Sequence, residues 1–210
     1  MPGTTLSRTT GGLLALFALV AAASIAAPSV ARAQGAQAKL TPQLDSVRAG
    51  LNKYQDPMVA VADGYLSTLA CIEFPKPFAE GPLKVVAGGM GVHFINMSTV
   101  GPTLDAKKPQ VLIYEPQGDK LVLVAAEWFM PMQVAGATHP AIFGQAMNGP
   151  MEGHPPIMPP ELHHYDLHVW LWRENPAGVF SPTNPAVKCG KGQYSFAGDP
   201  PKMVGEHAHN

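Results

Sequence analysis

The segment His163–Trp172 restricts the possible folds of this chain more than any other part of its sequence. It is rich in aromatic and β-branched residues, which predicts a β-strand. Side chains alternate between the two faces of a strand, so its polar residues would share one face with two large aromatic residues. That face would carry His164, Asp166, His168, Trp170 and Trp172. Two imidazoles and a carboxylate are costly to bury unless they form polar pairs or bind a metal ion, so the segment predicts a site on a sheet.

The first 33 residues are predicted to be a signal peptide. Arg8 supplies a positive charge, residues 12–27 are apolar, and Ala31-Arg32-Ala33 fits the small-x-small rule for cleavage after Ala33. The alternative is a retained membrane anchor, but the apolar run is at the short end for a membrane span. The sequence has neither a twin-arginine pair nor a cysteine just after the cleavage site. We therefore expect general export to the periplasm or the extracellular space, without a stable membrane anchor.

Composition describes the mature chain as loop-rich and weakly acidic. Removal of Arg8 and Arg32 would leave 12 basic residues against 15 acidic ones, a formal net charge of −3. No basic stripe remains that would bind nucleic acid. The 22 prolines, 21 glycines and 14% charged residues argue against a helical bundle. We expect a flexible leader over residues 34–40, one domain over residues 41–189, and a loose tail over residues 190–210.

The first part of the domain is predicted to be helical. Thr41-Pro42 and Asp56-Pro57 each combine an N-cap residue with a proline at the first helical position. Apolar residues at helical spacing follow each pair, which predicts helices over residues 42–54 and 57–70.

The remainder of the domain is predicted to form strands. Short apolar runs between turn residues predict four of them, Gly91–Asn96, Val111–Glu115, Leu121–Phe129 and residues 164–173. Gln117–Lys120 has the composition of a hairpin turn. Helices followed by hairpin-connected strands are typical of an α+β fold. We expect two N-terminal helices packed on an antiparallel sheet of four or more strands.

Residues 130–162 are predicted to be a long loop, because they are rich in proline, glycine and methionine and lack periodicity. A loop of this length in a compact domain is usually functional or disordered. Its thioethers and imidazoles are a ligand combination that suits Cu(I), although methionine also fills irregular gaps in packing. The residues concerned are Met130, Met132, Met147, Met151, Met158, His139, His154 and His163.

The two cysteines, Cys71 and Cys189, are predicted to form a disulfide, because an exported chain folds in an oxidising compartment. Such a long closed loop would stabilise the fold by a few kcal/mol in the chain-entropy model. A cysteine metal ligand or a free nucleophile is the alternative.

Each predicted strand carries an ionisable residue among apolar ones. If the strand faces coincide, these residues converge as a set of histidines and carboxylates that suits Zn, Mn, Fe or Cu. The candidate metal ligands are His93, Glu115, Glu127, His164 and His168, and Asp166 would orient an imidazole from the second shell. His164 and His168 would be about 13 Å apart at Cα, so they share one ion only if the strand bends.

Several functions fit this pattern. The first is an exported protein that binds one divalent transition metal or a small ligand through the His/carboxylate pocket. A second is a metal-dependent, hydrolase-like enzyme that uses Glu127 as its general base. A third is a non-catalytic envelope interaction domain that contacts its partner through residues 130–162. A histidine–aspartate pair can also be an ordinary hydrogen-bonded tie between strands, and the sequence identifies neither a substrate nor a protein partner.

The domain contains a series of linked motifs: Gly89–Asn96, Val111–Pro116, Glu127–Pro131, Phe143–Gln145, His164–Trp172, Asn175-Pro176 and Asn184-Pro185. Together they resemble a family of exported bacterial proteins of unknown function. The similarity would cover residues 55–189, including both cysteines, and it implies one exported domain without implying an activity. The doubled His163-His164 and the methionine-rich loop depart from the family pattern.

Overall fold

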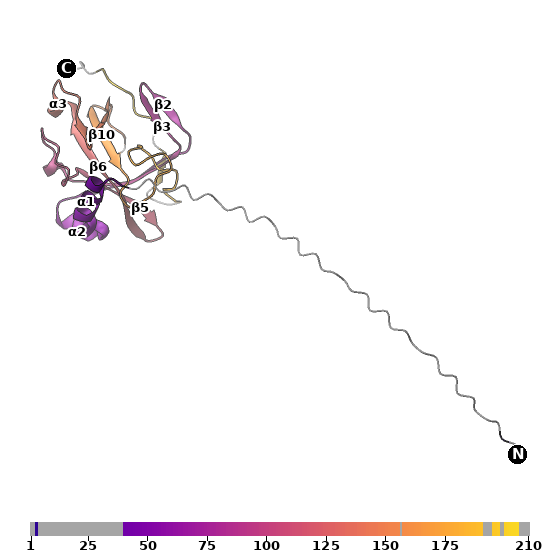
Figure 1. Ribbon diagram of the computed structural model, residues 1–210. Coiled ribbons are helices and arrows are strands. Elements are labelled where there is room, and N and C mark those ends of the chain that lie inside the picture. The colour runs from indigo at the N-terminus through magenta and orange to yellow at the C-terminus, as the bar shows by residue number, and fades with distance from the viewer. Residues whose placement is uncertain (1–2, 4–39, 156, 191–194, 198–199, 206–210) are drawn as a thin grey trace. The chain divides into compact units, whose positions relative to one another are not determined.

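A large curled sheet accompanied by a few short helices makes up the structure (Figure 1), a computed structural model. It describes Gly3 and residues 40–155, 157–190, 195–197 and 200–205. The predicted signal peptide and all but the last residue of the predicted leader, apart from Gly3, lie outside these ranges. The α+β class is confirmed. None of the described helices has the length and apolar character that a membrane-crossing helix needs.

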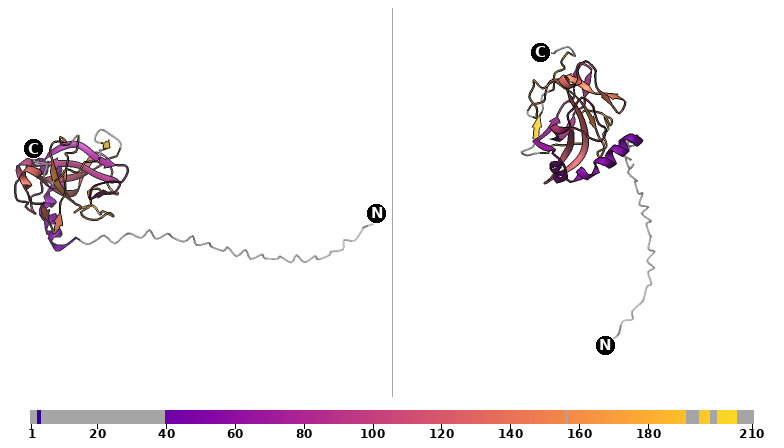
Figure 2. Two further views of the ribbon diagram at one scale, coloured as in Figure 1. Left: turned by 90° about the horizontal axis from the view of Figure 1, so that it is seen from above. Right: turned by 90° about the vertical axis from the view of Figure 1, so that its left-hand side faces the viewer.

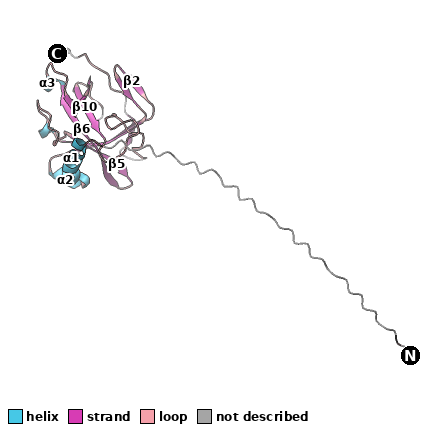
Figure 3. Cartoon of the chain, in the orientation of Figure 1, coloured by secondary structure: helices cyan, strands magenta, loops and turns pink. Residues whose placement is uncertain are grey.

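In the described part of the chain, the main sheet has seven strands, six of which are joined to one another by antiparallel pairing. The seventh, β11, pairs with β1 in parallel. Strands are drawn in magenta in Figure 3. The order across the sheet is β11 (Ser195–Ala197), β1 (Leu66–Phe74), β4 (Gly88–Ile95), β5 (Val111–Gln117), β6 (Lys120–Pro131), β10 (His164–Val169) and β9 (Asn148–Met151). Two small hairpins pair β2 (Phe78–Glu80) with β3 (Leu83–Val85), and β7 (Ala141–Ile142) with β8 (Gln145–Ala146).

The four predicted strands form the continuous centre of this sheet, β4–β5–β6–β10. The predicted hairpin turn is also present. Gln117 pairs with Lys120, and the turn between them has Gly118 at a φ of 64°, which glycine adopts without a steric penalty. The last strand ends at Val169 rather than at residue 173.

The helices are short. They are α1 (Pro42–Leu51), a 3₁₀ turn η1 (Asn52–Gln55), α2 (Pro57–Ala62), η2 (Met97–Thr99) and α3 (Met132–Ala135). The side chains of Thr41 and Asp56 cap α1 and α2 by accepting the backbone N–H groups of Leu44 and Met58.

The prediction of one helix over residues 57–70 is wrong beyond Ala62. Gly64 turns the chain with a φ of 92°, and β1 begins at Leu66. Pairing of β1 with β4 overrides the helical spacing of the apolar residues in this segment.

The prediction that residues 130–162 form one long loop is wrong. The segment contains α3, the β7–β8 hairpin and β9, which pairs with the edge of β10. Two parts of the predicted loose tail are paired: β11 lies beside β1 (Figure 2), and Met203 forms an isolated bridge with Met151. β9, β11 and Met203 pair with other segments of the chain, and such pairing is not encoded in the local sequence.

The two faces of the central sheet pack against different groups. One face forms a large apolar cluster with α1, to which Leu44 and Leu51 contribute on the helix side and Leu167 on the sheet side. The opposite face carries a smaller apolar cluster that includes Ile113, Phe129 and Trp170. Alternation along each strand therefore separates two distinct environments.

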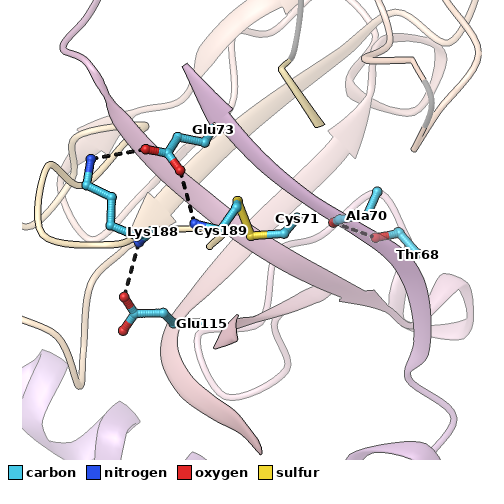
Figure 4. Close-up of a disulfide and its surroundings, with 7 residues drawn as sticks. All are labelled: Thr68, Ala70, Cys71, Glu73, Glu115, Lys188 and Cys189. Carbon is cyan, nitrogen blue, oxygen red and sulfur yellow. Dashed lines mark hydrogen bonds and ion pairs between the residues drawn. A yellow bond between two sulfur atoms is a disulfide. The ribbon is translucent and has the colours of Figure 1, made fainter. Parts of the chain in front are cut away.

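The predicted disulfide is present and joins Cys71 of β1 to Cys189, 118 residues away (Figure 4). Carboxylates surround it. Glu73 accepts hydrogen bonds from the Cys189 N–H and from Lys188 Nζ, both at 3.0 Å. Glu115 accepts the Lys188 N–H at 3.1 Å. These bonds hold the C-terminal segment against β1 and β5.

A Cys71→Ser/Cys189→Ser variant should lower the free energy of unfolding by about 2–5 kcal/mol, because the unfolded chain regains the freedom of a long loop. Urea unfolding of the wild type and the variant measures the difference. Reduced wild-type protein is the control and should match the variant. An unchanged unfolding midpoint in both samples would contradict a stabilising role for the disulfide.

Candidate metal centre

Three strands bring His93, Glu127 and His168 together on the face opposite α1. His168 on β10 pairs directly with Glu127 on β6. His93 on β4 pairs with Ile113 of β5, which pairs in turn with Ala125, two residues before Glu127. Residues two apart on a strand share a face, so the pairing directs all three side chains to one place.

The separations between ligand atoms in this group are longer than those of ordinary hydrogen bonds. Nε2 of His93 lies 3.4 Å, and Nε2 of His168 lies 3.6 Å, from Oε2 of Glu127. Ordinary hydrogen bonds of this kind are about 2.7–3.2 Å long. Two ligands bound tetrahedrally at about 2.0–2.1 Å from one ion are about 3.4 Å apart. The two distances therefore fit the edges of a coordination tetrahedron.

The three side chains are almost completely buried, with exposed fractions of 3%, 3% and 0% for His93, Glu127 and His168. Burial lowers the pKa of His93 to about 4 and holds the pKa of His168 well below its usual value. Both imidazoles are therefore neutral at pH 7, the form that binds metal. Burial raises the pKa of Glu127, and the charge of Asp166 raises it further. A cation beside Oε2 would reverse this shift, because it stabilises the carboxylate.

A second group adjoins the first and contains His154, His164 and Asp166, whose ligand atoms lie within 4.8 Å of one another. Nε2 of His164 is 3.9 Å from Oδ2 of Asp166. The Nδ1 of His164 donates to the carbonyl of Leu162 at 3.1 Å, which leaves Nε2 as the unprotonated nitrogen. The Asn148 amide donates to Asp166. Burial raises the pKa of Asp166 to about 7 and lowers those of His154 and His164 to about 4 and 3.

Unpaired polar atoms concentrate in this cluster of two groups. Among the described residues, the buried side-chain nitrogen and oxygen atoms without a hydrogen-bond partner all belong to it, apart from Nε of Arg173. Such atoms are rare in folded proteins, and each calls for an explanation such as an ion or a water molecule. They are Nδ1 of His93, Oε2 of Glu127, Nε2 of His164, and both ring nitrogens of His168.

The predicted ligands are thus divided among three places. His93, Glu127 and His168 form one group. His164 lies in the adjacent group together with Asp166, which was predicted to orient an imidazole. Glu115 joins neither group. Its carboxylate lies further along β5, where it accepts hydrogen bonds from the Lys188 N–H and the Gln117 amide.

Two further residues differ from the sequence prediction. Trp172 lies beyond the end of β10, where its Nε1 donates to Asn52 near α1, so it does not share the face of His168. His154 was not among the predicted ligands of the divalent ion. The sequence indicated it only as one of the possible Cu(I) ligands in the segment 130–162.

A concavity with a volume of about 610 Å³ is separate from this cluster, and its lining includes Val92, Phe94, Met58 and Leu69. Val92 and Phe94 flank His93 on β4 and therefore face the opposite side of the sheet. A small ligand in this groove would not contact the histidine and carboxylate side chains.

Comparison with known proteins finds no matching family model, curated protein or solved structure. The resemblance to a family of exported bacterial proteins stays a prediction. The site is therefore interpreted from its own geometry.

Metal-free protein should lose stability as the pH falls from 6.5 towards 4. The four clustered histidines stay neutral in the folded protein but take up protons on unfolding, because burial lowers their pKa values. Glu127 and Asp166 oppose this effect, because their raised pKa values let the folded protein keep protons that the unfolded chain releases. The protons taken up by the four histidines on unfolding outnumber those released by the two carboxyl groups. The free energy of unfolding should therefore fall by about 1–3 kcal/mol per pH unit.

Urea unfolding across this pH range, with a chelator present, measures the effect. A His93→Gln/His168→Gln variant keeps two histidines and two carboxyl groups of the cluster, whose effects nearly cancel. Its stability should change little over the same range. Equal pH dependence of the variant and the wild type would show that His93 and His168 titrate as in the unfolded chain.

Proposed function

We propose that this protein is an exported metal-binding protein that holds one divalent transition-metal ion between His93, Glu127 and His168. One observation carries the proposal. Three buried side chains from β4, β6 and β10 converge, with Nε2 of both imidazoles 3.4–3.6 Å from Oε2 of Glu127. Oε2 of Glu127 and Nε2 of His168 have no hydrogen-bond partner among the described residues.

The chemistry of the ligand set narrows the choice of metal. Two neutral imidazoles and a carboxylate suit borderline ions, so Zn, Mn, Fe and Cu are the candidates. Ca and Mg prefer sets made entirely of oxygen atoms, which this group does not offer. Glu127 cancels one positive charge of the ion, which reduces the cost of burying it.

The rigidity of the sheet supports metal binding as well. Each ligand lies inside a strand that pairs on both sides, so the backbone holds the three side chains in place before an ion arrives. A preformed set of ligands loses little conformational entropy on binding.

The burial of the ligands favours binding over hydrolysis. A hydrolase that uses Glu127 as its general base needs a cleft in which a substrate reaches the metal. Glu127 instead faces both imidazoles and is 3% exposed. The disulfide Cys71–Cys189 supports an oxidising compartment and hence export.

Replacement of a ligand should abolish tight metal binding. Glu127→Gln and His168→Gln should each weaken binding of Zn²⁺ or Mn²⁺ by roughly 100-fold, since each removes one of three protein ligands. Isothermal titration of the mature protein, purified without a histidine tag, gives the affinities. Elemental analysis gives the metal content.

Glu115→Gln is the matched control, because Glu115 is another buried carboxylate inside a strand of the same sheet. It should bind metal as the wild type does. The proposal is wrong if Glu127→Gln retains wild-type affinity, or if the wild type binds none of Zn²⁺, Mn²⁺, Fe²⁺ and Cu²⁺ after reconstitution.

A further inference from the structure

We infer that the adjacent group binds a second, softer ion, Cu(I), through the Met151 thioether and the imidazoles of His154 and His164. This site is distinct from the group proposed to bind a divalent ion, and the inference does not depend on that proposal.

The sulfur atom is the first reason. Sδ of Met151 lies 3.3 Å from Nε2 of His154, and Met151 is 1% exposed. First-row metal bonds of about 2.0 Å to nitrogen and 2.3 Å to sulfur give ligand separations of about 3.5 Å in a tetrahedron. Thioether sulfur is a soft ligand that prefers Cu(I) to the harder divalent ions.

His164 supplies an oriented nitrogen to the same place. Its Nδ1 donates to the Leu162 carbonyl, so the lone pair of Nε2 is available. Nε2 is buried and has no hydrogen-bond partner among the described residues. The imidazole rings of His154 and His164 lie 5.0 Å apart between centroids, at an angle of 57°. A hydrogen bond from the nitrogen that is not a ligand is the usual way in which proteins fix a metal-binding histidine.

The surroundings fit a small monovalent ion. A cavity of about 10 Å³ adjoins the group, which is room for about one water-sized occupant. Its lining combines Met151, His154 and Asp166 with apolar side chains, including Phe74 and Met90. The two imidazoles and the thioether are neutral ligands, so the Asp166 carboxylate balances the single charge of Cu(I). A divalent ion in the same place would leave a positive charge in an apolar environment, which is costly.

The backbone brings the ligands together from three segments. Met151 ends β9, His154 follows it by three residues, and His164 begins β10. Met151 and His164 are paired across the two strands, so the β9–β10 ladder sets the site. A structural alternative is that the Nε2–H of His154 donates weakly to sulfur within an ordinary packed core.

Anaerobic titration of the mature protein with Cu(I), against a chromophoric Cu(I) chelator, tests the inference. The wild type should bind Cu(I) with a sulfur scatterer at about 2.3 Å in X-ray absorption spectra. Met151→Leu keeps the volume of the side chain but removes the thioether. It should weaken Cu(I) binding by at least about 10-fold and eliminate the sulfur signal.

Met147→Leu is the matched control, because Met147 is a buried methionine of the same segment that packs in the large cluster with α1. It should bind Cu(I) as the wild type does. His93→Gln/His168→Gln should retain the Cu(I) site, and Met151→Leu should retain Zn²⁺ binding, so the two proposed sites can fail independently. Unchanged Cu(I) affinity in Met151→Leu, or loss of Cu(I) only in His93→Gln/His168→Gln, overturns the inference.

Discussion

The pairing of β10 with β6 is the constraint on which the rest of the structure depends. It sets His168 opposite Glu127 on one face and Leu167 opposite Trp128 on the other, so the polar and the apolar side chains of β10 lie on opposite faces of the sheet. A shift of one residue would move the polar side chains into the cluster beneath α1 and expose apolar ones to the polar face. The hydrophobic pattern that fixes the sheet therefore also assembles the candidate metal centre.

The central sheet could be predicted from the sequence because its strands alternate regularly and a glycine-containing turn joins two of them. β1 could not be predicted. Its pairing with β4 shifts between Ser67 and Cys71, and Leu69 has a φ of 58°, so no alternation survives in its first half. The short strands β9 and β11 depend on pairing with β10 and β1, which no local pattern encodes.

The candidate metal centre could also be predicted only in part. A period of two residues identifies the face of a side chain, and on this basis His93, Glu127 and His168 were predictable as one group. It does not identify the position along the strand, which is why Glu115 was predicted and lies elsewhere. The spacing of His164 and His168, about 13 Å at Cα, correctly implied that they could not share one ion on a straight strand. The position of His154 beside His164 could not be predicted, because it depends on the pairing of β9 with β10.

A metal-free polar network is the alternative explanation for the cluster, and the distribution of donors argues against it. Each neutral imidazole has one N–H donor and one acceptor nitrogen. Such rings could satisfy Glu127 and Asp166 through short, direct bonds. Instead, both His168 nitrogens and Oε2 of Glu127 stay unpaired within the described chain, although Nε2 and Oε2 are 3.6 Å apart. A network that served only stability would be expected to close this gap, because each buried unpaired atom costs about 1–3 kcal/mol. An ion between Nε2 of His168 and Oε2 of Glu127 would satisfy both of these atoms at the distance observed.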